Sequence, residues 1–321
     1  MAERVPKVLV VGPTYVDMAV KCDSFPVPGK TVEGSEFSCL PTGAGLNEAI
    51  QAALCGCEVY LLSRVGEDCF GEMIKQMLKR HGVSTDLLYP TQAISTGIVI
   101  TLVDGHGENS SCRSTGANRV LGRDEIEYAG AEQLIQSADV CLLSDGLPQN
   151  AAVSAIRSAQ LYKTRVVLEA RLPAVDRQVM RSIHWPTEFY NTDLLILRFS
   201  GIVCGSELGA GGEGDLKAIG IELVAGGARC VVISMGWHGA LVIDRQGQRR
   251  IPGIMMDVVD QTGCESAFAG ALAASYGCGD NPDRAVKFAV AAETLARSRF
   301  GLQDALPKKE DIILLLQNQP D

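Results

Sequence analysis

The chain has 321 residues, with 29 Lys and Arg against 38 Asp and Glu, which gives a formal net charge of −9. Its 46% hydrophobic and 21% charged residues are typical of a globular protein and exclude intrinsic disorder. The acidic balance argues against nucleic acids and membranes as partners, because both attract clustered Lys and Arg. No apolar run precedes the first strand-like segment or is long enough to span a bilayer, so we expect a cytoplasmic protein.

Strand-like and helix-like segments alternate along most of the chain. Continuous apolar runs predict strands at 7–12, 59–65, 140–143, 165–168, 193–197 and 230–234. Apolar residues at helical spacing predict helices at 45–56, 70–81, 124–136, 150–161, 214–225, 266–276, 283–299 and 308–317. This alternation indicates an α/β fold with a doubly wound, mostly parallel sheet and helices on both faces.

Two stretches, 17–40 and 97–118, break the alternation. Both contain short alternating runs and turn residues, but neither has a helical pattern. We expect them to form antiparallel strands of a small β lid over the carboxyl edge of the main sheet, where open α/β folds bind ligands. No repeat or linker is visible, so residues 1–321 are predicted to form one domain that includes the lid.

The cysteines and histidines indicate neither a disulfide framework nor a metal centre. The 11 Cys are odd in number and scattered, and only Cys55 and Cys57 lie close together. Zinc sites and disulfide-rich domains show paired, regular spacings, which this chain lacks. The four His are also far apart in sequence. We therefore expect no bound metal, and we expect most thiols to be buried as small apolar groups.

Three segments place polar or glycine residues where predicted strands end or helices begin. Asp17 follows the first strand, where its carboxylate could accept hydrogen bonds from ligand hydroxyls. In TGAGLN at 42–47, Gly43 permits close approach of a ligand, and Asn47 adds a polar group. DQTGCES at 260–266 leads into an Ala-rich helix whose N-terminal N–H groups favour anions. A turn or helix cap explains each segment taken alone.

In this order, the three segments resemble the ribokinase-like (PfkB) family of carbohydrate and nucleoside kinases. Further matching segments cover nearly the whole chain, among them RVGEDCFG at 64–71, GAN at 116–118 and SMGWHGA at 234–240. The family reaction moves the γ-phosphoryl group of Mg·ATP onto a hydroxymethyl oxygen, and a base takes the hydroxyl proton.

The resemblance also implies roles for individual residues. Asp17, Gly43 and Asn47 would hold the sugar or nucleoside under the lid. Gly236 and Gly239 would lie beside the nucleotide, in a groove formed by the C-terminal half. Some family members dimerise through the lid, and the edges of such a flap are compatible with a homodimer here.

The chain departs from the family at the residues that carry the chemistry. The family signature is roughly D-T-T-G-A-G-D, and its last Asp is the base. Ser266 occupies that position, and a hydroxyl cannot accept a proton near pH 7. Gly263 and Cys264 belong to the implied anion hole, where Glu265 replaces a Gly. Unless its carboxylate turns outward, Glu265 would repel a phosphate there.

Two further family features are missing, and several residues could compensate. RFSG at 198–201 replaces the family's N-x-x-E segment, and Gly146 replaces an acidic sugar-pocket residue. Glu265 could act as a displaced base, and Arg198 could neutralise phosphate without Mg²⁺. Cys264 could be a reactive thiol at a helix N-terminus, although a packed small residue is the simpler interpretation.

Two hypotheses follow. The first is a kinase that uses ATP and Mg²⁺ to phosphorylate a sugar or nucleoside, with activity that is weak or altered because Ser266 replaces the base. The alternative is a catalytically inactive protein that binds a sugar or nucleoside as a sensor or protein partner and needs no cofactor. The visible losses lie mostly on the phosphate side of the site, which is the basis of the second hypothesis.

Overall fold

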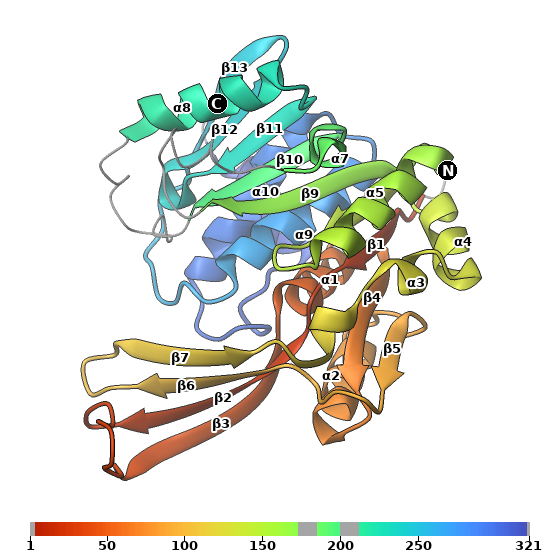
Figure 1. Cartoon of the computed structure of the whole chain (residues 1–321). Helices are drawn as coiled ribbons and strands as arrows, with labels where there is room; N and C mark the ends of the chain where they lie inside the picture. Colours follow the sequence, from red (N-terminus) through yellow and green to blue (C-terminus); the bar gives the residue numbers. More distant parts are fainter. Residues whose placement is uncertain (1–3, 173–184, 200–211, 320–321) are drawn as a thin grey trace.

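The computed structural model describes residues 4–172, 185–199 and 212–319. Its main sheet has nine strands in the order β13-β12-β11-β10-β9-β8-β1-β4-β5 (Figure 1). The strands are β1 (Lys7–Val11), β4 (Glu58–Gly66), β5 (Leu88–Thr91), β8 (Val140–Leu143), β9 (Arg165–Leu172), β10 (Leu194–Phe199), β11 (Cys230–Ser234), β12 (Gly239–Asp244) and β13 (Gly247–Pro252). Neighbours pair in parallel from β5 to β11, and only β12 and β13 are antiparallel. The predicted mostly parallel sheet is confirmed.

Helices cover both faces of this sheet. One layer contains α1 (Ala44–Leu54), α2 (Cys69–Arg80), α9 (Cys264–Gly277), α10 (Pro282–Arg297) and α11 (Lys309–Gln317). The other contains α3 (Arg123–Ile126), α4 (Ala129–Ser137), α5 (Gln149–Tyr162), α7 (Thr187–Tyr190) and α8 (Gly212–Ala225). Along β1, Val8 and Val10 pack into the first layer, whereas Leu9 and Val11 pack into the second. This alternation explains why the strand is apolar at every position.

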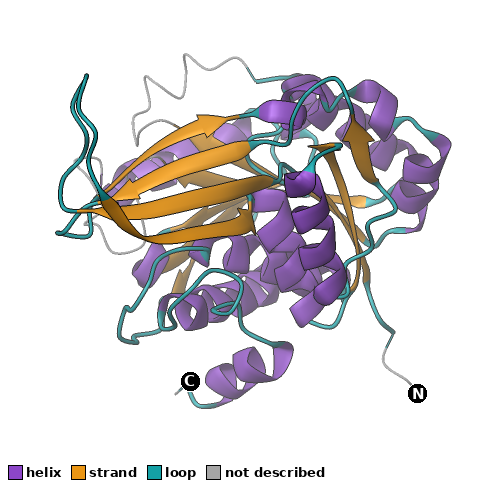
Figure 2. Ribbon diagram, turned by 90° about the horizontal axis from the view of Figure 1, so that it is seen from below, coloured by secondary structure: helices purple, strands orange, loops and turns teal. Residues whose placement is uncertain are grey.

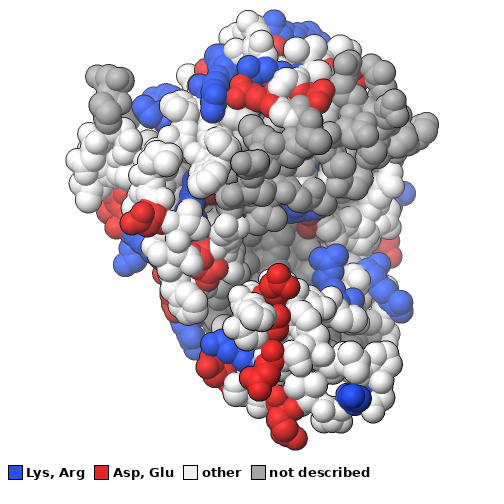
Figure 3. Space-filling model, turned by 90° about the vertical axis from the view of Figure 1, so that its left-hand side faces the viewer, with Lys and Arg blue, Asp and Glu red and all other residues white. Residues whose placement is uncertain are grey.

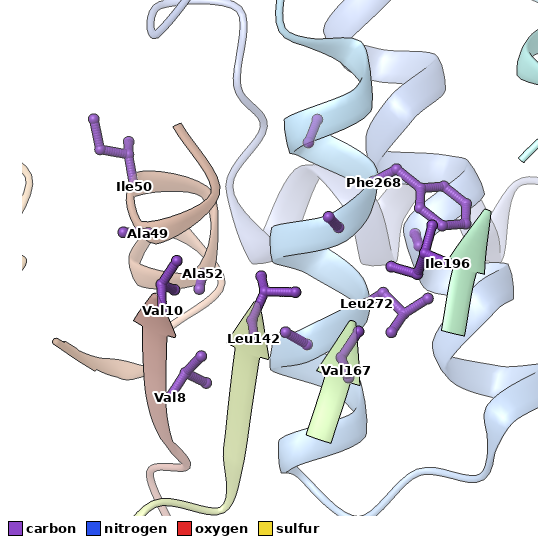
Figure 4. Packing of buried hydrophobic residues seen from close by; sticks show 14 of the residues in the cluster. Val8, Val10, Ala49, Ile50, Ala52, Leu142, Val167, Ile196, Phe268 and Leu272 are labelled. Carbon is purple, nitrogen blue, oxygen red and sulfur yellow. The ribbon is translucent and has the colours of Figure 1, made fainter. Parts of the chain in front are cut away.

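Helix α9 packs directly against the main sheet in the first helix layer. Phe268 and Leu272 on this helix lie over Val167 and Ile196 of the sheet (Figure 4). The helix is rich in small residues because its backbone nearly touches that of α1. A side chain at Gly270 would begin 2.5 Å from the carbonyl oxygen of Glu48. The Ala-rich sequence of 267–274 is therefore a packing requirement that fixes where α9 begins.

The lid is a second sheet of four strands, ordered β3-β2-β6-β7. It contains β2 (Tyr15–Cys22), β3 (Gly34–Thr42), β6 (Ile98–Val103) and β7 (Asn109–Ser114), which project from the main body (Figure 2). β2 and β6 pair in parallel, so the prediction of purely antiparallel strands is wrong for this pair. The reason is that both strands enter the lid from the main sheet in the same direction (Figure 1).

Two other expectations need correction. The helix predicted at 124–136 is divided into α3 and α4, because the backbone of Tyr128 is extended, with ψ at 137°. β9 continues four residues beyond its predicted end at Leu168. The polar Glu169 and Arg171 hide this continuation from an apolar pattern, and both belong to the site described below. Two short 3₁₀ helices complete the fold: η1 (Gly116–Val120) lies between β7 and α3, and η2 (Gly236–His238) lies between β11 and β12.

None of the helices in the described residues has the length and apolar character that crossing a membrane requires.

We expect Leu272→Ala to lower the free energy of unfolding by about 2–5 kcal/mol, because a fully buried side chain would leave a cavity under α9. Leu314→Ala on α11 is the control, since its side chain is 59% exposed, and it should change stability by less than about 0.5 kcal/mol. Urea denaturation measures both. Equal effects would contradict the role assigned to the α9 packing.

Candidate functional site

A cleft of about 700 Å³ lies between the lid and the carboxyl edge of the main sheet. Its walls come from the lid strands, the start of α1, the ends of β8 and β9, and the first turn of α9. Six residues singled out from the sequence line it: Gly43, Asn47, Gly146, Gly263, Glu265 and Ser266. The fold therefore brings together segments that are more than 200 residues apart in the chain.

The start of α1 is shaped by Gly43 and Asn47. Gly43 has a φ of 115°, and a side chain there would begin 2.6 Å from the carbonyl oxygen of Pro13, so only glycine fits. The Asn47 side-chain oxygen accepts a hydrogen bond of 2.9 Å from Gln303, which also donates to the Pro41 carbonyl at 2.8 Å. This arrangement leaves the NH₂ group of Asn47 to donate to a ligand.

Asp17 lies on the lid, outside the residues that line the cleft. It is two residues beyond Tyr15 on β2, so both side chains are on the lid face that covers the cleft. Its carboxylate accepts a hydrogen bond of 2.8 Å from the Thr101 hydroxyl. Asp17 could therefore contact only a ligand that extends from the cleft along the underside of the lid.

Arg171, which the sequence analysis missed, lies at the centre of the cleft's charges. Its guanidinium donates to Asp145 at 2.7 Å and to Glu265 at 2.6 Å. Burial would raise the pKa of Glu265, but Arg198 and Arg171 together hold it below its ordinary value. The carboxylate of Glu265 is therefore paired, which weakens the repulsion of phosphate expected from the sequence.

A second ion pair lies buried behind the cleft. Arg198 donates to Glu169 at 2.8 and 3.0 Å, and both side chains are 3% exposed. Burial opposes the charge on Arg198, yet the carboxylates of Glu169, Glu265 and Glu293 raise its pKa overall. Arg198 also donates to the backbone carbonyl of Glu265 at 2.6 Å.

Arg198 therefore holds the first turn of α9 and is not among the residues that line the cleft. This placement does not support the idea that it neutralises a phosphate directly. Of the segment predicted to replace N-x-x-E, residues 200–201 lie outside the described residues.

Comparison with known proteins identifies the family. Residues 5–309 match the pfkB family of carbohydrate kinases. The chain belongs to this family. Ribokinase of Bacillus subtilis is 27% identical over 312 residues, which cover 96% of this chain and 99% of that protein. Deoxyribokinase of Salmonella typhi is 25% identical over 306 residues, which cover 94% and 96%.

A solved structure agrees with the fold. Arabidopsis thaliana ribokinase complexed with ribose and ATP gives a TM-score of 0.86 at 21% identity, covering 98% of this chain and 100% of that one. The ribokinase-like fold predicted from the sequence is thereby confirmed.

The signature region of this PfkB chain differs chemically from the pattern that the resemblance implies. Ser266, in the first turn of α9, is 9% exposed and lines the cleft. The acids of the described lining are Asp145 and Glu265, and both are bound to Arg171. Cys264 is fully buried, and its sulfur lies 3.8 Å from the Asp260 carbonyl oxygen, which favours the packed thiol over the reactive one.

Gly236 and Gly239 lie in the connection between β11 and β12, outside the cleft lining. Gly239 has a φ of 91°, and a side chain there would begin 2.0 Å from the carbonyl oxygen of Ile251. The tight turn itself requires this glycine, so its presence does not depend on a nucleotide. The roles that the resemblance implies for these two residues stay predictions.

The residues present fit Mg·ATP only in part. The N-terminus of α9, opened by Gly263 at φ 79°, suits an anion. The same turn offers a hydroxyl and a paired carboxylate in place of a base. Across 4–172, 185–199 and 212–319, no three His, Cys, Asp or Glu side chains are grouped to hold a metal. The turn therefore suits an anion, and its described side chains include no unpaired carboxylate.

Charged residues of both signs are also present elsewhere on the surface. On the face seen in Figure 3, Lys and Arg lie interspersed with Asp and Glu among the described residues. The pairs in the cleft follow the same pattern, with oppositely charged groups in contact.

The Arg171–Glu265 pair predicts a pH-dependent stability difference. Because the folded pKa of Glu265 is lowered, its stabilisation is present above the unfolded value of about 4.3 and is lost as pH falls through the folded pKa. Glu265→Gln should therefore be less stable than the parent at pH 7, by at most about 1 kcal/mol because the pair is 33% and 40% exposed. Urea denaturation from pH 7 to 3 should show this difference in the free energy of unfolding shrink as the pH falls; a difference independent of pH would contradict the pairing.

Proposed function

We propose that this chain binds a sugar or nucleoside in the cleft under its lid and transfers a phosphoryl group from ATP slowly or not at all. In this proposal Gly43 and Asn47 hold the ligand from below, and Asp17 holds it from the lid. Residues 1–321 act as one unit, in which the lid covers the ligand.

One observation carries the proposal: no carboxylate of the described cleft lining is available as a base. Ser266 stands at the family's base position, and its hydroxyl has far too high a pKa to accept a proton near neutrality. Asp145 and Glu265 are both held by Arg171. The lowered pKa of Glu265 makes it a weaker proton acceptor still, which argues against the displaced base.

The sugar side of the cleft supports retained binding. Gly43 is required by its backbone, and Asn47 is held in place by Gln303. These features form a rigid, pre-organised wall, which favours affinity because little freedom is lost on binding. A working kinase with an altered catalytic end is the second candidate, favoured by similarity to ribokinase along nearly the whole chain.

The binding proposal predicts ligand-specific stabilisation. In a thermal-shift panel of pentoses, hexoses and nucleosides, we expect at least one compound to raise the melting temperature, because a ligand that binds only the folded state stabilises it. Mg·ATP should raise it little. Asn47→Ala is the matched variant and should reduce the sugar effect; strong stabilisation by Mg·ATP alone would count against the proposal.

The missing base predicts a gain of function. The double variant Ser266→Asp with Glu265→Gly should raise ADP release in the presence of sugar by about 10²–10⁴-fold, the usual contribution of a positioned base. Arg171 keeps Asp145 as a partner in this variant, so the cleft retains an ion pair.

The control is Ser266→Asn with Glu265→Gly, which matches the shape of Asp but cannot accept the proton. It should remain as slow as the parent. Rapid sugar phosphorylation by the unmodified chain would refute the proposal, and no gain in the Asp variant would place the defect outside these two positions.

A further inference from the structure

A cation on the lid faces the cleft without an acidic partner among the residues that the structure describes. Arg113, on the edge strand β7, lines the cleft, and its guanidinium carbon lies 5.5 Å from the centre of the Tyr15 ring. Arg113 pairs with Val99 on β6, which pairs with Asp17 on β2 (Figure 1). These three residues form one row across the lid face that covers the cleft.

The other charges in the cleft lining pair with one another, whereas Arg113 has no oppositely charged partner in the described part of the chain. Arg171 is bound to both Asp145 and Glu265. Arg113 makes no ion pair with any residue that the structure describes, and its interaction there is with the Tyr15 ring. Asp17 is two strands away, about 10 Å between backbones, and its carboxylate is bonded to Thr101.

An edge-strand Arg often serves only to discourage pairing with another sheet. Arg113 differs from this case because its side chain, although exposed to solvent, lines the cleft and lies over a Tyr15 ring that is 5% exposed. When a ligand fills the cleft, it displaces water from around this guanidinium. A neutral sugar would leave the cation poorly paired, which is unfavourable, whereas an anionic group would replace the lost water with a charge-assisted hydrogen bond.

We propose that the natural ligand of the cleft is an anionic polyol, a sugar derivative that carries a carboxylate or phosphate group paired with Arg113. Its hydroxyl groups lie toward Asp17, at the other end of the lid row, and toward Asn47 at the start of α1. This inference rests on the proposed sugar binding and adds the charge of the ligand. It is independent of whether phosphoryl transfer occurs.

The experiment compares matched neutral and carboxylate ligands by isothermal titration calorimetry. The probes are D-ribose against D-ribonate and D-glucose against D-gluconate, with parent protein, Arg113→Gln and Arg113→Lys. Arg119→Gln is the control, because this nearby Arg is exposed and lies outside the cleft lining.

We expect a carboxylate to bind the parent at least tenfold more tightly than its neutral counterpart. Arg113→Gln should weaken carboxylate binding by about 10- to 100-fold and change neutral sugar binding by less than about threefold, because only the charged hydrogen bond is lost. Arg113→Lys should keep part of the preference, since a point charge remains. Arg119→Gln should match the parent.

Three results would overturn the inference while leaving the proposed function standing. The first is tighter binding of neutral sugars than of the acids. The second is a preference for acids that survives Arg113→Gln. The third is an Arg113→Gln variant that binds Mg·ATP more weakly but binds the acids as the parent does. Failure of all four probes and of the whole sugar and nucleoside panel would instead overturn the proposed function, and this inference with it.

Discussion

The site depends on the buried ion pair between Arg198 and Glu169. Two charges that are 3% exposed are tolerated only with good geometry, and removing either partner from such a pair typically destabilises a protein by about 3–5 kcal/mol. Arg198 also donates to the backbone carbonyl of Glu265. The first turn of α9 is therefore tied to strands β9 and β10 by charge as well as by apolar packing.

A cluster of acids surrounds this cation. Burial and the neighbouring carboxylate of Glu169 hold the pKa of Glu48 well above its usual range, while Ser144 donates to Glu48 at 2.5 Å. One cation thus organises acids from α1 and β9, and Arg171 organises those nearer the surface. The two acids of the described cleft lining are thus both paired with Arg171, and with Ser266 at the family's base position this is the physical reason that we favour binding over transfer.

The sequence predicted the architecture well, because burial on both faces leaves a continuous apolar pattern in strands such as β1. It also located Gly43, Asn47 and Ser266, since turns and helix starts have local signatures. Arg171 was missed because a polar residue at a strand end has no pattern of its own. Its partner Glu265 is 94 residues away in the chain. The nearest available signal was its position just after a predicted strand, the same signal that singled out Asp17.

The residues on the two sides of the cleft are subject to different physical constraints. On the sugar side, Gly43 is fixed by steric contact with Pro13, so any side chain there would disturb the fold itself. On the phosphate side, Ser266 is 9% exposed in the first turn of α9, where its hydroxyl replaces the carboxylate that the resemblance implies. A change at Ser266 alters the chemistry of the site, whereas a side chain at Gly43 would disturb its backbone. Gly43 alone is thus weak support for ligand binding, and the charge of Arg113, which has no acidic partner among the described residues, is stronger support.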